Sequence, residues 1–324
     1  MRDVLDGYKV LYERLGYRDD PDAALVRAML VPFLGIAGSP LTQEPLHKKR
    51  ELLAAAAARY PGNADIAWQR AKSCAYVDGC QRAEVIDRLL ALEPDNLAGW
   101  LLALAEAKSA ANEAAIDATL EAAAKAKHYD TRTAASSLRL QEALQQPPLP
   151  PSCLSPEAQE TWRGPEVSQR PRTSFDMATL MANNILGTEI PAYGPLLDAC
   201  TARMGRPLRP ERLAACRAVA ATVASGDDLI DRMIGERLMV SLTREASDGE
   251  QWRERYRQTL WMMEPRGDVL PGLDGVRRRW EVGEVRALEQ ALATKGLWPA
   301  PTGWLPANES SRNRVMNEGS AIRE

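Results

Sequence analysis

The stretch YPGNADIAW at residues 60–68 decides the fold, because it recurs as EPDNLAGW at residues 93–100. Three residue types repeat in register, namely Pro61 and Pro94, Asn63 and Asn96, and Trp68 and Trp100. The prolines and the asparagines are 33 residues apart, and the tryptophans are 32 residues apart. An internal period of about 20–50 residues is typical of repeat proteins. The sequence therefore predicts an all-α fold that begins as a stack of helical hairpins.

Each residue type has a physical role at the start of a helix. Proline ends the preceding helix and fixes the turn. Asparagine accepts hydrogen bonds from the free N–H groups of the next helix. Tryptophan, one turn further on, is placed to pack on a neighbouring helix.

The two units resemble the tetratricopeptide repeat over about residues 58–128. Both tryptophans stand where that family has an early aromatic residue, and Pro94 matches its closing proline. The units depart from the family at Lys72 and Leu104, which replace the glycine of its Leu-Gly pair. The resemblance implies antiparallel helix hairpins in a right-handed superhelix. It also implies binding of a protein or peptide, without naming the partner.

Composition divides the chain into four parts. We expect a tetratricopeptide-like helical repeat domain over residues 1–146, a proline-rich linker over 147–173, a C-terminal helical domain over 174–298 and an irregular tail over 299–324. The linker is predicted because no helix interior tolerates its closely spaced prolines. Around the start of the tail, Trp298 and Trp304 are expected to be partly exposed.

Apolar residues at helical spacing predict the remaining helices. In the first part we expect helices over residues 3–15, 22–34, 42–60 and 131–145. Beyond the linker we expect helices over residues 174–186, 191–203, 209–224, 227–247, 249–264 and 276–294. Ser174 is the expected N-cap of the first of these. No stretch predicts a β-strand.

Charge and hydropathy exclude two classes of partner. The chain of 324 residues has a net charge of −3, so we expect no nucleic acid, which needs a concentrated basic surface. No run of about 18 apolar residues predicts a membrane span. Residues 1–16 lack the apolar core of a secretory signal, which favours the cytoplasm. An exported or periplasmic location is the alternative if the start has been trimmed.

The five cysteines allow two readings. With two histidines and no CxxC motif in the chain, a zinc site is not expected. Two pairs bracket predicted turns, Cys74 and Cys80 around residues 78–79, and Cys200 and Cys216 around residues 205–210. Each pair could form a disulfide that staples a hairpin in an oxidising compartment. Alternatively, these residues are small buried hydrophobic groups of a reduced core.

One motif suggests chemistry, namely Asp227-Asp228-Leu229-Ile230-Asp231. It resembles the aspartate-rich motif of prenyl-chain and terpene synthases, which implies magnesium ligands at Asp227, Asp228 and Asp231 for a diphosphate substrate. No second such motif follows. A capping pair of Ser225 and Asp228, with Asp228 also facing Arg232, explains the same residues more economically.

The sequence thus favours a non-enzymatic scaffold that binds a protein or peptide partner. It assigns no catalytic, cofactor-binding or metal-binding residue, and no cofactor. Two alternatives stay open, namely an all-α magnesium-dependent enzyme and an exported structural protein stapled by disulfides.

Overall fold

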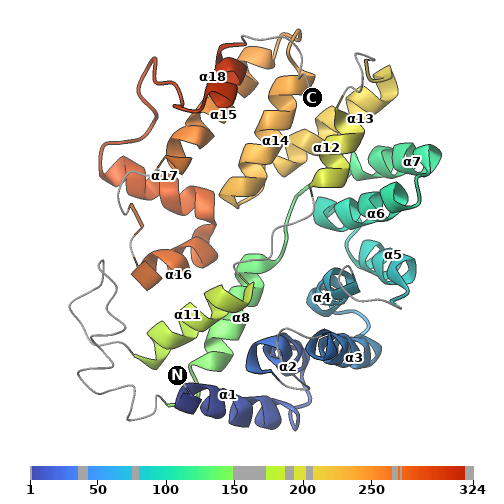
Figure 1. Cartoon of the computed structure of the whole chain (residues 1–324), viewed down its shortest axis with the longest axis vertical. Coiled ribbons are helices and arrows are strands. Elements are labelled where there is room, and N and C mark those ends of the chain that lie inside the picture. The colour runs from blue at the N-terminus through green and yellow to red at the C-terminus, as the bar shows by residue number, and fades with distance from the viewer. Residues whose placement is uncertain are drawn as a thin grey trace. The chain divides into compact units, whose positions relative to one another are not determined.

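The computed structural model describes residues 2–35, 43–74, 80–148, 173–186, 193–201, 207–264, 269–270 and 272–317. These ranges contain sixteen helices and no strand, apart from one isolated bridge between Asn96 and His128. The chain is therefore all-α, as the repeat signature predicts (Figure 1). Residues 78–79 and nearly all of the expected linker, except 147, 148 and 173, lie outside the described residues.

Contacts divide the chain into two compact units. Unit 1 comprises residues 1–93, 131–191 and 271–281, and unit 2 comprises residues 94–130, 192–270 and 282–324. Each unit thus combines segments from both sides of the expected linker. The expected domains follow composition rather than contacts, and their separate folding stays a prediction.

Unit 1 is built from helices that pack in sequence and are then joined by later ones. Its helices are α1 (Arg2–Leu15), α2 (Pro21–Leu34), α3 (Glu44–Arg59), α4 (Ala64–Cys74), α5 (Arg82–Leu92), α8 (Thr133–Leu144), α11 (Ser174–Leu186) and most of α16 (Gly272–Val282). Helix α2 packs on α3, α3 on α4 and α4 on α5, while α8 packs on α11 (Figure 1). One apolar core joins α1, α2, α3, α8 and α11 and includes Ile66 of α4.

Local sequence explains how α2 begins and ends. The side chain of Asp20 accepts a hydrogen bond from the N–H of Ala23 at 2.8 Å, and Pro21 occupies the first turn. Gly35 ends the helix with φ 61°. Pro32 lies inside the helix and does not stop it.

Unit 2 continues with the second signature hairpin and most of the C-terminal helices. These are α6 (Leu97–Ser109), α7 (Glu113–Ala123), α12 (Gly194–Cys200), α13 (Pro210–Val223), α14 (Leu229–Leu242), α15 (Gly249–Met263), α17 (Glu284–Thr294) and α18 (Glu309–Met316). Helix α6 packs on α7, α7 on α13, α13 on α14 and α14 on α15. Helices from beyond the expected linker therefore extend the α6–α7 hairpin.

Four details of the C-terminal half differ from expectation. The helix expected over residues 276–294 is two helices, because Gly283 has φ 87° and interrupts the helical backbone. The helix expected over residues 227–247 ends at Leu242. The expected irregular tail contains α18, which Asn308 caps. Finally, Thr173 rather than Ser174 caps α11, through reciprocal hydrogen bonds with Asp176.

The two tail tryptophans are half-buried, as expected. The ring of Trp304 lies edge-on to that of Trp261, with ring centroids 5.0 Å apart. This contact, together with the hydrogen bond from Trp261 Nε1 to the carbonyl of Leu297 at 2.8 Å, fastens residues 297–304 to α15.

Candidate functional site

The signature asparagines cap the helices that follow them. The side chain of Asn63 accepts a hydrogen bond from the N–H of Ile66 at 2.9 Å, and that of Asn96 accepts one from Ala98 at 3.1 Å. The tryptophans are less alike. Trp68 is buried in α4, whereas Trp100 is half-buried and donates from Nε1 to the carbonyl of Pro94 at 2.8 Å.

Helix α4 is held by a buried ion-pair network that no short motif reveals. The carboxylate of Asp65, in the first turn of α4, forms ion pairs with the guanidinium groups of Arg132 and Arg139, each at 2.5 Å. Arg132 also forms two hydrogen bonds with Glu93. Burial opposes the charge of Arg132, but its bonds to Glu93 and Asp65 raise its pKa above the usual value.

Helix α4 does not present the exposed polar side that a peptide groove would need. Eight of the eleven residues of α4 are buried, including the polar side chains of Asp65, Gln69 and Ser73. Arg132 lies just before α8 and Arg139 lies on it, so the chain's own later segment contacts α4 here. An open groove lined by outward polar side chains of α4 is therefore absent from the described part of unit 1.

Helices α3 and α5, which both pack on α4, differ from it because each has an exposed side. Each exposes a single stripe at helical spacing, residues 51, 55, 58 and 59 on α3 and residues 84, 87, 88 and 91 on α5. The guanidinium of Arg88 donates to the carbonyl of Pro61 at 2.7 Å, which ties α5 to the turn between α3 and α4. We call these two stripes the outer face of unit 1.

The aspartate motif at residues 227–231 occupies the start of α14. Asp227 is exposed, Asp228 stands at the N-cap position and Asp231 is buried. The expected capping pair does not form, because Ser225 bonds the carbonyl of Thr222 and Asp228 makes no side-chain cap. Glu284 of α17 caps the helix instead, accepting a hydrogen bond from the N–H of Leu229 at 2.9 Å.

The sequence predicts that Arg232 pairs with Asp228, but it forms ion pairs with two glutamates instead. It lies 3.1 Å from the carboxylate of Glu236, which is fully buried, and 3.1 Å from that of Glu289. Burial raises the pKa of Glu236, while Thr259 and the two arginines Arg232 and Arg255 oppose that shift. The pairing is structural and joins α14 to α15 and α17.

Asp231 is the buried carboxyl group of the motif. Burial, followed by the negative charge of Glu284, raises its pKa to about 7. Burial and the nearby Asp231 also raise the pKa of Tyr129 well above its usual value. The hydroxyl of Tyr129 lies 3.0 Å from that of Tyr193.

The three aspartates of the motif lie in different environments. Asp227 is exposed and Asp231 is buried, whereas magnesium is commonly held by one or two charged carboxylates together with substrate phosphates. Within the described residues no group of three or more His, Cys, Asp or Glu side chains is arranged to hold a metal ion.

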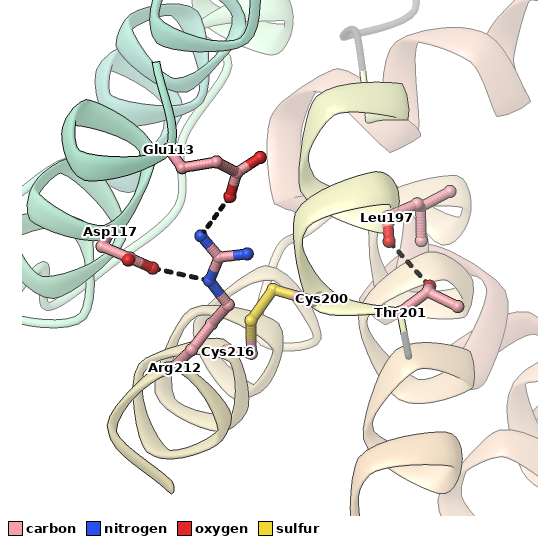
Figure 2. The surroundings of a disulfide bond; sticks show 7 residues. All are labelled: Glu113, Asp117, Leu197, Cys200, Thr201, Arg212 and Cys216. Atoms are coloured by element: carbon pink, nitrogen blue, oxygen red, sulfur yellow. Dashed lines mark hydrogen bonds and ion pairs between the residues drawn. A yellow bond between two sulfur atoms is a disulfide. The ribbon is translucent and has the colours of Figure 1, made fainter. Parts of the chain in front are cut away.

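Both expected cysteine pairs are disulfides in the structure. The Cα atoms of Cys74 and Cys80 are 5.5 Å apart, and those of Cys200 and Cys216 are 5.6 Å apart, within the usual range for this bond. The first closes the end of α4 onto the residues before α5. The second joins α12 to α13 (Figure 2).

Beside the second disulfide, α13 is clamped to α7. Figure 2 shows Arg212 reaching from α13 toward Glu113 and Asp117, at 2.7 and 2.6 Å. Arg209 pairs with Asp117 as well. The hydrogen bond from Arg212 lowers the pKa of Glu113. Because α12 also packs on α6, the disulfide and the clamp together hold α12 and α13 on the second signature hairpin.

Thiol counting tests both bonds. Of the five cysteines, four are paired, so the denatured chain prepared without reductant should show one reactive thiol, that of Cys153. After reduction it should show all five. Titration with a chromogenic thiol reagent measures both numbers, and five thiols before reduction would show that neither bond forms.

The structure also contains a small cavity in unit 1. A cavity between α1, Leu144, Pro147 and Ser174 has a volume of only about 10 Å³, room for a single water molecule. Among the described helices, none has the length and apolar character required to cross a membrane.

No family model, curated protein or solved structure matches the chain.

Proposed function

We propose that the chain is a non-enzymatic scaffold of the tetratricopeptide-like kind, which binds a protein or peptide partner through the outer face of unit 1. The observation that carries this proposal is the contrast between α4 and its two neighbours. Helix α4 is buried on nearly every side, while α3 and α5 each present one exposed stripe. Among the described residues of α3, α4 and α5, the outer face is therefore the part that is exposed to a partner.

The chemistry of the outer face suits a protein partner. It mixes three small apolar residues, Ala55, Ala58 and Ala91, with five charged ones, Glu51, Arg59, Glu84, Asp87 and Arg88. Small residues let a partner helix approach closely, and rim charges guide its orientation. Within the described residues neither Glu84 nor Asp87 forms an ion pair, so both can be reversed without breaking the fold.

Affinity capture with matched variants tests the proposal. The full chain, the double variant Glu84→Arg/Asp87→Arg and the control Glu13→Arg/Glu142→Arg would each be immobilised and exposed to the same cell extract. The control reverses two exposed acids on α1 and α8, so its net charge equals that of the test variant. A protein retained by the parent and the control but lost from the test variant supports the proposal. Retention of the same proteins by all three would overturn it.

The disulfides support a second candidate, a protein that works outside the reducing cytoplasm. Both bonds fasten helix ends, and such bonds persist where thiols are oxidised. This candidate concerns the compartment and is compatible with a scaffold. The thiol count described above tests the two bonds on which this candidate rests.

A further inference from the structure

The start of α14 and the start of α17 form a junction within unit 2. The carboxylate of Glu284 accepts the hydrogen bond from the N–H of Leu229, and the N–H of Val285 donates to the carbonyl of Asp227 at 2.9 Å. These two bonds run in opposite directions between the two segments. Gly283 makes the close approach possible, since a Cβ there would lie 3.1 Å from the side chain of Asp227.

A buried carboxyl group lies at this junction. Asp231 is only 3% exposed, and the Cβ that a residue other than glycine would have at position 226 would lie 3.2 Å from the Cβ of Asp231 and 2.9 Å from the ring of Tyr129. The backbone of Gly226 is thus enclosed between these two side chains. Ionising a carboxyl group in such a place is unfavourable unless a cation compensates it.

Within the described residues, Asp231 forms no ion pair with a cation. Glu284 faces it from α17, Asp227 and Asp228 precede it, and Tyr129 faces it from the segment after α7, next to Asp130. The adjacent cation on α14, Arg232, is bound to Glu236 and Glu289. Both burial and like charge therefore favour the protonated form of Asp231.

Within the described residues, α17 packs into a small apolar cluster. A small cluster of four buried residues, Leu229, Met262, Val285 and Leu292, with Leu297 and Trp298 at its edge, packs this helix. Segments with few buried apolar contacts open locally at lower cost than the main core. Leu229 and Val285 belong both to this cluster and to the junction, so opening of the junction would loosen the cluster too.

We infer that the junction of α14 and α17 is a pH-sensitive latch, which a proton on Asp231 keeps closed and which opens more often as the pH rises toward neutrality. In the open state Asp231 regains its ordinary affinity for a proton. Since the closed state binds the proton more tightly, the closed state loses its advantage by about tenfold per pH unit. The loss runs from the ordinary value of 3.8 up to about 7 and then levels off.

Hydrogen exchange at the junction tests the latch. The exchange of peptides covering residues 225–232 and 283–297 in the full chain would be measured between about pH 5 and pH 8, and corrected for the intrinsic rate at each pH. Protection should fall by about tenfold per pH unit up to about pH 6.5 and change little above pH 7. Peptides of α7 and α13 serve as the internal reference and should stay constant.

Two variants separate the latch from a general effect of pH. Asp231→Asn should stay closed across the range, with no loss of protection. Glu284→Gln keeps an oxygen for the N–H of Leu229 but removes the neighbouring charge, so its loss of protection should be smaller and end at a lower pH. The exposed acid Asp198 on α12 provides the control, and Asp198→Asn should behave like the parent. Parent protection that does not change with pH, or an unchanged dependence in Asp231→Asn, would overturn the inference.

Discussion

Replacing Gly235 with alanine should destabilise unit 2 by about 3 kcal/mol, although alanine is the better helix former by about 1 kcal/mol. Gly235 lies in α14 where this helix meets α13. A Cβ at this position would lie 2.3 Å from the backbone nitrogen of Ala224 and 2.7 Å from the carbonyl oxygen of Ala220. Backbone atoms cannot turn away as a flexible side chain can, so the two helices must move apart.

Gly194 provides the matched control for this prediction. It lies in the same unit at the first position of α12, and a Cβ there would meet nothing within 4 Å. Urea unfolding followed by circular dichroism at 222 nm measures the free energy of unfolding of both variants. If Gly235→Ala proved as stable as Gly194→Ala, the close packing of α13 on α14 would be wrong.

Removing the carboxylate of Asp65 should also cost about 3 kcal/mol, because it leaves buried positive charge without its partner. The side chain of Asp65 is 9% exposed, and those of its partners Arg132 and Arg139 are 19% and 31% exposed. Arg132 would retain Glu93, but Arg139 would keep only its contact with Asp22. Asp65→Ala should therefore lower the midpoint of urea unfolding.

Asp22 serves as the control, since it contacts the same arginine but its side chain is 60% exposed. Ion pairs in such exposed positions contribute little to stability. Asp22→Ala should accordingly unfold close to the parent. Equal effects of Asp65→Ala and Asp22→Ala would contradict the buried network as the element that fixes α8 against α4.

The sequence predicts the helices of this protein well where caps and periodicity are local. Asn63 and Asn96 cap the starts of α4 and α6, and their capping hydrogen bonds span at most three residues of sequence. Both cysteine pairs bracket predicted turns, so their spacing allows each pair to bond but does not distinguish a disulfide from a reduced core. Gly283 shows the limit of this approach, because a positive φ at a glycine depends on the packing of the residues around it.

Long-range partners could not be predicted in this way. Asp65 and Arg132 are 67 residues apart, and Leu229 and Glu284 are 55 residues apart. In the sequence, Asp228 and Arg232 form a plausible helical pair, yet Glu236 and Glu289 bind that arginine instead. The contacts that Arg132 and Arg139 make with Asp65 of α4 have the same long-range origin.

The affinity of the captured protein for the chain is the most direct test of binding through the outer face of unit 1. Titration calorimetry would compare the parent chain, Glu84→Arg/Asp87→Arg and the control Glu13→Arg/Glu142→Arg with the same purified partner. Binding through the outer face predicts equal dissociation constants for the parent and the control. The outer-face variant should have a dissociation constant at least about tenfold higher, which is a loss of about 1.4 kcal/mol of binding free energy. Equal affinities for all three proteins would contradict it.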